Sequence, residues 1–167
     1  MAVEEGDLVE PGGKVRLFVE QPIAAGTPVT LDDGQAHYLR HVMRARAGTA
    51  VQIFNGRDGE WRAVLALSSR RGAAATPQRQ TRPQGASGDL WLCFAPVKKA
   101  ASEFVAQKAT ELGVSELRPI VTRRTIVSRV NVDRMLANAI EAAEQSDRLD
   151  VPACQAPLGA ARELWVA

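Results

Sequence analysis

The pattern of apolar residues changes in kind part-way along the chain, and this change limits the folds open to it. Before residue 68, apolar and polar residues alternate in short runs, which is typical of strands. After residue 88, a continuous apolar run is followed by apolar residues at helical spacing. We therefore expect two domains of different architecture, a small β-barrel and then a parallel α/β domain.

The segment between these two parts differs in composition. Residues 68–88 consist largely of Ser, Arg, Ala, Pro, Gln and Gly, as flexible linkers do. The predicted organisation is a loose leader (1–14), a barrel (15–70), a flexible basic linker (71–88) and the α/β domain (89–167).

The first part is expected to be mostly strand. Asp32 or Asp33 is placed to cap a helix over residues 35–46 that Gly48 ends. On that helix the inward residues are predicted to be Leu39, Val42 and Met43. The expected strands are 15–20, 28–31, 50–54 and 61–67, the last two forming a hairpin.

The second part alternates strand and helix, which favours a parallel sheet. The apolar run Leu90–Ala95 predicts a strand buried on both faces. A helix over 97–112 follows, then a strand over 117–122 and a helix capped by Asn131. At 100° per residue, the first helix carries an apolar stripe of Val97, Ala101, Phe104, Val105 and Leu112.

Lys108 falls in the middle of that stripe. Burying an unpaired ammonium group is costly, so two interpretations stay open. In one, the lysine lines a functional site. In the other, its stem packs along apolar surface and its head reaches water or pairs with Glu111, one turn away.

The formal net charge is only +2, but the charge is unevenly distributed. Between Arg40 and Arg82, arginine is opposed only by Asp58 and Glu60. Such asymmetry indicates that one part of the chain meets a polyanion, and arginine suits phosphate groups. A base composition that favours Arg and Ala codons would also enrich arginine.

Two histidines, His37 and His41, have the i, i+4 spacing of two metal ligands. No third ligand accompanies them in a recognisable pattern, so we expect polar packing or an RNA contact and no metal. Cys93 and Cys154 lie far apart and are expected to be reduced and to face the core. With no apolar run long enough to span a membrane, the expected location is cytoplasmic.

The printed residues contain no glycine-rich dinucleotide or phosphate loop and no serine nucleophile motif. From the residues alone, the chain is a basic nucleic-acid-binding module joined to part of an enzyme. Several stretches then resemble the bacterial RsmE family of 16S ribosomal RNA uridine N(3)-methyltransferases. They are Arg16–Phe18, His37–Arg44, Phe54–Gly56, Gln107–Val114, Arg118–Pro119 with Arg123 and Arg124, and Ala143–Arg148 with Val151–Pro152.

This resemblance implies an N-terminal PUA-like RNA-binding barrel and a C-terminal SPOUT-class α/β-knot methyltransferase domain. It implies S-adenosylmethionine as methyl donor, small-subunit (16S) ribosomal RNA as substrate, and a homodimer that completes each active site. The candidate catalytic residues are Lys108, Glu111, Arg123, Arg124, Glu144 and Arg148. The candidate RNA-binding residues are Arg16, His37, Arg40, Arg44 and Arg57.

The sequence departs from the family in one respect. The Gly-Pro-Glu-Gly-Gly and Leu-Arg-x-Glu-Thr segments that form the knot and the cofactor pocket do not occur within residues 1–167. The cofactor-binding residues are therefore expected beyond Ala167. The expectation is a C-terminally truncated member, with an incomplete second domain, that does not bind the cofactor productively. Two alternatives stay open: an RNA-binding module without catalysis, and a fragment without function.

Overall fold

The computed structural model describes residues 15–68, 72–127 and 129–159. The predicted leader lies outside the described residues, and so does Ala167, beyond which the cofactor-binding residues are expected. The chain divides into two compact units, residues 1–85 and 86–167, which are considered separately. In the part of the chain that the structure describes, no helix is long and apolar enough to cross a membrane.

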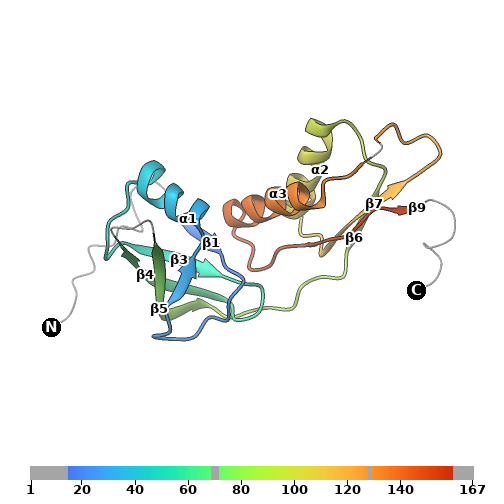
Figure 1. Cartoon of the computed structure of the whole chain (residues 1–167). Helices are drawn as coiled ribbons and strands as arrows, with labels where there is room; N and C mark the ends of the chain where they lie inside the picture. The colour runs from blue at the N-terminus through green and yellow to red at the C-terminus, as the bar shows by residue number, and fades with distance from the viewer. Residues whose placement is uncertain (1–14, 69–71, 128, 160–167) are drawn as a thin grey trace. The chain divides into compact units, whose positions relative to one another are not determined.

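The first unit is built on one mixed five-stranded sheet (Figure 1). Its order is β1-β3-β4-β5-β2. β1 runs parallel to β3, and the other neighbours are antiparallel. The strands are β1 (Arg16–Phe18), β2 (Val29–Leu31), β3 (Ala50–Phe54), β4 (Glu60–Leu67) and β5 (Ala73–Arg82). This curled half-barrel confirms the expected fold class of the first domain.

One face of this sheet carries the core of the unit. Because side chains alternate along a strand, Leu17, Ile53, Ala63 and Leu65 all project to the same side, where they are buried. Leu39 from the helical segment completes this cluster and is fully buried.

The predicted helix forms but ends early. α1 (Asp33–His37) begins with a capping box between Asp32 and Gln35. It continues as the π-helix η1 (Tyr38–Val42). Arg44, in the left-handed region at φ 52°, then takes the chain out of the helix, so the predicted end at residue 46 is wrong.

The π-helix also changes which residues point inward. In it, the N–H of Met43 bonds to the carbonyl of Tyr38 at 3.0 Å, an i→i+5 bond. The wider turn rotates later residues away from the positions that a 3.6-residue period predicts. Val42 is therefore 62% exposed and Met43 36% exposed, and only the Leu39 prediction holds.

The predicted flexible linker over residues 71–88 is wrong over most of its length. Residues 73–82 are β5, the longest strand of the first unit, and it pairs with both β4 and β2. Ala73, Ala75 and Pro77 fill the narrow space on the core face, where small side chains suffice. A strand of small residues resembles a low-complexity linker in composition, which accounts for the error.

The second unit has a parallel sheet covered by two helices (Figure 1). β6 and β8 pair with β7, and β9 pairs with the last residues of β7. The elements are β6 (Trp91–Phe94), α2 (Lys99–Glu111), β7 (Glu116–Val121), α3 (Val132–Gln145), β8 (Ala153–Cys154) and β9 (Leu158–Gly159). The expected alternation of strand and helix is confirmed.

The face that α2 buries is not the predicted apolar stripe. Ala106 and Ala109 of α2 are buried, as are Ala139 and Ala143 of α3. Ala106 and Ala109 pack in one cluster with Leu117 of β7 and Met135 of α3, so the small side chains of α2 face the core of the unit. The stripe is instead largely exposed: Val97 45%, Phe104 59% and Leu112 80%.

β6 is covered on one face only by the described residues. Leu92 and Phe94 pack against the core, whereas Trp91 is 47% exposed and Cys93 is also exposed. The predictions of a strand buried on both faces and of a core-facing Cys93 are therefore wrong. Cys154 does pack against the core, and burial raises the pKa of its thiol to about 11.

Candidate functional site

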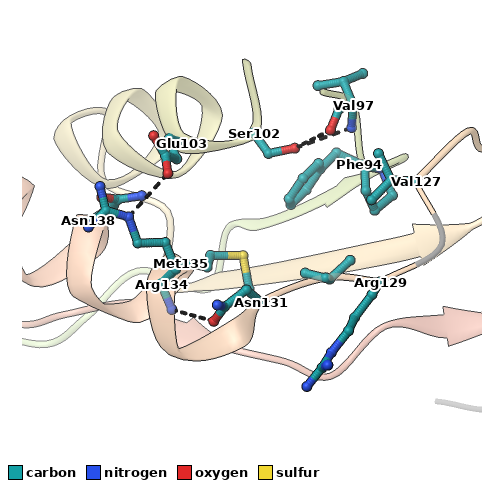
Figure 2. Close-up of a pocket in the computed structure, with 12 residues that line it drawn as sticks. Phe94, Val97, Ser102, Glu103, Val127, Arg129, Asn131, Arg134, Met135 and Asn138 are labelled. Carbon is teal, nitrogen blue, oxygen red and sulfur yellow. Dashed lines mark hydrogen bonds and ion pairs between the residues drawn. The ribbon is translucent and has the colours of Figure 1, made fainter. Parts of the chain in front are cut away.

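A cleft of about 590 Å³ lies in the second unit, after the carboxyl end of β6 (Figure 2). It opens between the first turns of α2 and α3 and the segment that follows β7. In open parallel sheets, ligands bind outside the carboxyl ends of the strands. Its lining combines apolar residues (Phe94, Pro96, Val97, Val127, Val130, Met135) with polar ones (Ser102, Glu103, Arg129, Asn131, Arg134, Asn138).

Local hydrogen bonds hold the walls of this cleft. The hydroxyl of Ser102 donates to the carbonyl of Val97 at 2.9 Å and accepts from the N–H of Val97 at 3.2 Å. Asn131 caps α3 by accepting from the N–H of Arg134 at 2.9 Å. These bonds fix the segment before α2 and the start of α3.

An ion pair joins the two helices beside the cleft. Arg134 Nε of α3 lies 3.1 Å from Glu103 Oε1 of α2, and Figure 2 shows the two side chains facing each other. Arg129, on the segment before α3, is exposed. Among the lining residues, two guanidinium groups therefore accompany one carboxylate, an arrangement that favours a neutral or anionic ligand.

Asn138 adds an unused donor to the lining. Its side-chain Nδ2 is buried and has no hydrogen-bond partner in the structure. Buried polar groups are normally paired, so such an exception indicates a ligand, a water molecule or a rearrangement. The residues lining this cleft are absent from the predicted site. The available signal was Asn131 and Asn138, seven residues apart and so on one helix face.

Lys108 and Glu111 form a pair on the surface of α2. Lys108 Nζ contacts both carboxylate oxygens of Glu111, at 2.7 and 2.9 Å, and lies 5.8 Å from the centre of the Phe104 ring. The structure thus agrees with the second interpretation from the sequence, in which Lys108 is half-exposed and paired with Glu111. The pair lies about 7 Å further along the helix axis than Glu103, towards the far end of α2.

Arg148 lies beyond the end of α3 and is nearly buried. Its Nη1 donates to the carbonyls of Thr110 and Val114, at 2.7 and 2.8 Å. Its Nε and Nη2 bind Asp150 at 3.2 and 3.0 Å. Burial alone would raise the pKa of Asp150, but hydrogen bonds from Arg148 and Ser87 outweigh it and lower that pKa.

The other predicted catalytic residues are dispersed. Arg123 and Arg124 are exposed, in the turn after β7, where the Thr125 hydroxyl accepts from the N–H of Thr122 at 2.8 Å. That turn follows the carboxyl end of the sheet, as the cleft does. Glu144 is half-buried in the last turn of α3.

The predicted RNA-binding residues divide into buried and exposed groups. Arg16 is 5% exposed, with Nε 2.7 Å from Glu60 Oε2 and its guanidinium over the ring of Phe54. Arg44 and His37 are exposed. The His37 ring lies 4.5 Å from that of His41, centre to centre.

Arg40 and Arg57 both bind main-chain carbonyls. Arg40 Nη2 donates to Ser68 and Gly72, at 2.8 and 2.7 Å, and so closes the turn between β4 and β5. Arg57 Nη2 donates to the carbonyl of Glu20 at 2.6 Å. In the described segments, no group of three His, Cys, Asp or Glu residues is arranged to hold a metal ion.

The loop between β3 and β4 is held in place by side-chain hydrogen bonds from Asn55. Asn55 Oδ1 accepts from the N–H groups of Arg57 and Asp58, and its Nδ2 donates to Gln21 and Asp58. Hydrogen bonds from the N–H of Ile23 and the amide of Asn55 lower the pKa of Asp58. The Phe-Asn-Gly stretch therefore has a structural role.

In comparison with known proteins, a separate family model matches each of the two units. Residues 31–78 match the model of the RNA methyltransferase PUA domain, and residues 84–165 match that of the RNA methyltransferase domain. The first match runs into β5, in agreement with its place in the sheet.

Two curated relatives carry the name ribosomal RNA small subunit methyltransferase E. The protein from Rickettsia conorii is 28% identical over 138 residues, which are 82% of this chain and 57% of that protein. The protein from Synechocystis is 32% identical over 145 residues, which are 86% and 48%. The chain thus spans about half the length of the curated relatives it matches.

Solved structures agree. The ribosomal RNA small subunit methyltransferase E of Neisseria gonorrhoeae, bound to S-adenosyl methionine, is 26% identical with a TM-score of 0.78, over 87% of this chain and 62% of that one. A putative methyltransferase from Legionella pneumophila shares the fold, at 22% identity and a TM-score of 0.78 over 87% and 63%. Both units are therefore matched by RNA methyltransferase family models, and the chain is similar over most of its length to the ribosomal RNA small subunit methyltransferase E proteins.

Proposed function

We propose that this protein takes part in methylating the imide nitrogen, position 3, of a uridine in small-subunit ribosomal RNA, with S-adenosylmethionine as methyl donor. The observation that carries the proposal is the ordered match of both units to RNA methyltransferase families. The cofactor named for the Neisseria gonorrhoeae structure supports the choice of donor. Such an enzyme would act in the cytoplasm, where ribosomes assemble.

The chemistry asks for specific groups. The imide nitrogen of uridine is a weak acid, and it becomes an effective nucleophile only when its proton is removed. Negative charge then develops on the two flanking carbonyl oxygens, and preorganised cationic or N–H donors stabilise it. Because nitrogen attacks the methyl carbon directly, no covalent enzyme intermediate is required.

We assign the charge-stabilising role first to Arg123 and Arg124, which are exposed beyond the carboxyl end of β7. Lys108 and Glu111, paired on α2, and Glu144 stay proposals as further donors or bases. Arg148 is proposed as a positioning residue, because its donors are already engaged by α2 carbonyls and by Asp150.

The described residues do not fit the cofactor itself. Its sulfonium carries a positive charge, whereas the cleft presents Arg129 and Arg134, and its carboxylate, Glu103, is already paired. Among its described lining residues there is no glycine to admit close approach of a backbone. The cleft is better suited to the uridine acceptor, and the cofactor-binding residues stay a proposal for positions beyond Ala167. A polypeptide of residues 1–167 is expected to give no calorimetric binding signal with S-adenosylmethionine.

We also propose that the enzyme acts as a homodimer. Phe104 of α2 and Leu112, directly after it, are large apolar side chains that are 59% and 80% exposed. Exposed apolar patches of this kind mark interaction surfaces. Phe104→Glu with Leu112→Glu is expected to give monomers in sedimentation equilibrium. An unchanged sedimentation mass in that double variant would refute the assignment.

The experiment that tests the function is methyl transfer to RNA. The protein, together with the residues beyond Ala167 that are proposed to bind the cofactor, is incubated with unmodified small-subunit ribosomal RNA and labelled S-adenosylmethionine, and the nucleosides are then separated by mass spectrometry. The expected product is 3-methyluridine, with a loss of rate on Arg123→Ala with Arg124→Ala. A label found on another nucleoside would refute the assigned position, and RNA binding without any methyl transfer would support a non-catalytic RNA-binding module.

A further inference from the structure

The register of the first sheet assembles arginines on the face opposite the core. Gln52 of β3 lies opposite Arg16 of β1 and Arg62 of β4, and Arg62 lies opposite Arg79 of β5. Residues directly opposite one another project to the same face. These four side chains therefore form one row across four strands, on the other side of the sheet from Leu17 and Ala63.

A second row lies next to the first. Phe18, Phe54, Glu60 and Arg82 are opposite one another on β1, β3, β4 and β5. Glu60, fully buried, is the carboxylate of these two rows; it pairs with Arg16 at 2.7 Å and lies 3.7 Å from Arg82. Across both rows the arginines outnumber the carboxylate, so the face is basic.

The accessible part of this face lies on β4 and β5. Arg79 is exposed, Arg62 is half-buried with Nη1 3.1 Å from Gln78 Oε1, and the side chain of Arg82 is 40% exposed. The pairing of β2 with β5 ends at Ala75, and the N–H of Gly26 bonds to the carbonyl of Pro77 at 2.8 Å, so residues 78–82 form the edge of the described sheet. The described helix packs on the other face, through Ala36 and Leu39.

Two arginines directly opposite each other on antiparallel strands repel, and such pairs destabilise a sheet. A single charge suffices to discourage edge-to-edge pairing, so protection of the edge does not account for the pair. Opposite residues have Cα atoms about 5 Å apart, so two arginines there, by contrast, can present their guanidinium groups to a ligand that brings several negative charges in a line.

We propose that the β4–β5 face, defined by Arg62, Arg79 and Arg82, binds the phosphodiester backbone of the RNA substrate. This inference rests on the proposed function for the identity of the RNA, but not on catalysis. It places the main electrostatic contact on the exposed part of the sheet. Of the residues expected from sequence, Arg16 is buried on this face and paired with Glu60, and the others lie on or next to the helical segment or bind protein carbonyls. Neither Arg62 nor Arg79 was among those candidates.

The test is the salt dependence of RNA binding. Fluorescence anisotropy with a labelled, unmodified small-subunit ribosomal RNA transcript is measured from 50 to 300 mM KCl for the whole chain and for Arg62→Gln with Arg79→Gln. Loss of two phosphate contacts is expected to reduce the slope of log K against log[salt] by about 1.4–1.8. The affinity is expected to fall at least about tenfold, because charge-assisted contacts are lost.

Two matched variants sharpen the test. Arg46→Gln removes an exposed arginine of the same unit that is not on this face, and it is expected to leave the slope within about 0.5 of wild type. The variant Arg62→Lys with Arg79→Lys keeps the positive charges but loses the planar guanidinium that binds phosphate through two hydrogen bonds. It should therefore keep the salt-dependence slope and bind RNA more weakly.

The outcomes separate this inference from the proposed function. If the double Gln variant has an unchanged slope and methyl transfer is intact, the proposed RNA-binding role of the β4–β5 face is refuted and the proposed function is retained. A reduced slope without 3-methyluridine supports the surface and removes the function. Aggregation of the double Gln variant with an unchanged slope in its soluble fraction assigns the arginines to edge protection and also overturns the surface.

Discussion

The guanidinium of Arg148 donates to the carbonyl oxygen of Thr110 at 2.7 Å, across the junction between α3 and the end of α2. Thr110 belongs to the last turn of α2, and its carbonyl, which has no i+4 partner, also accepts from the N–H of Gly113 at 3.0 Å. A cation at this end also interacts favourably with the helix dipole. Arg148 thus links the segment Ala109–Val114, through the carbonyls of Thr110 and Val114, to the carboxylate of Asp150.

Replacement of Arg148 should therefore destabilise the second unit. Arg148→Ala is expected to lower the free energy of unfolding by about 2–4 kcal/mol, because two carbonyls and the Asp150 carboxylate lose a nearly buried partner. Urea denaturation followed by tryptophan fluorescence, in a background with Trp61→Phe and Trp165→Phe, measures this. Arg124→Ala, at an exposed position, is the control and should cost less than about 0.5 kcal/mol. Equal urea midpoints for Arg148→Ala and Arg124→Ala would contradict a stabilising role for the Arg148 hydrogen bonds.

Glu60 holds the buried charges of the first unit. It is fully buried, pairs with Arg16, and accepts from the Thr81 hydroxyl at 2.9 Å. Glu60→Ala is expected to cost about 3–5 kcal/mol, since Arg16 then keeps an uncompensated buried charge. Glu20→Ala, at an exposed position, is the comparison. Thermal unfolding of Glu60→Ala at the wild-type temperature would show that the pair is dispensable.

Acid sensitivity should involve Asp58. The folded-state pKa of this carboxyl lies below its unfolded value because of the bonds from Ile23 and Asn55. Its contribution to stability is therefore present above the unfolded pKa and is lost as pH falls through the folded pKa. Asp58→Asn should flatten the decline in unfolding free energy between pH 5 and pH 3. Parallel pH profiles for the two proteins would count against this assignment.

The buried face of α3 should tolerate little added volume. Ala139 is fully buried, whereas Ala137, two residues earlier, is exposed. Ala139→Leu is expected to destabilise by about 1–3 kcal/mol through overpacking, and Ala137→Leu to be close to neutral. Guanidinium denaturation compares them directly. A neutral Ala139→Leu would mean that the helices pack more loosely than the structure shows.

Local sequence determined the elements whose signals lie within a few residues. The caps at Asp32 and Asn131 fix where α1 and α3 begin, since a side-chain oxygen satisfies nearby N–H groups. The alternation through Ala63 and Leu65 fixes the inward face of β4. Gly113, at φ 91°, ends α2, as the positive φ that glycine adopts readily allows. The resemblance to the RsmE family was recognisable from short stretches.

Tertiary structure decided what those signals could not. β5 exists because β4 and β2 supply partners for a segment that carries little hydrophobic signal of its own. α2 buries Ala106 and Ala109 because β7 and α3 supply Leu117 and Met135 on that side, and Phe104 stays exposed. Arg62 and Arg79 come together only through strand register, and Phe94 and Asn138 only through the packing of α3 beside β6. Strand pairing and helix packing bring together residues that are distant in sequence. A pattern within a few consecutive residues does not indicate which distant residues will become their neighbours.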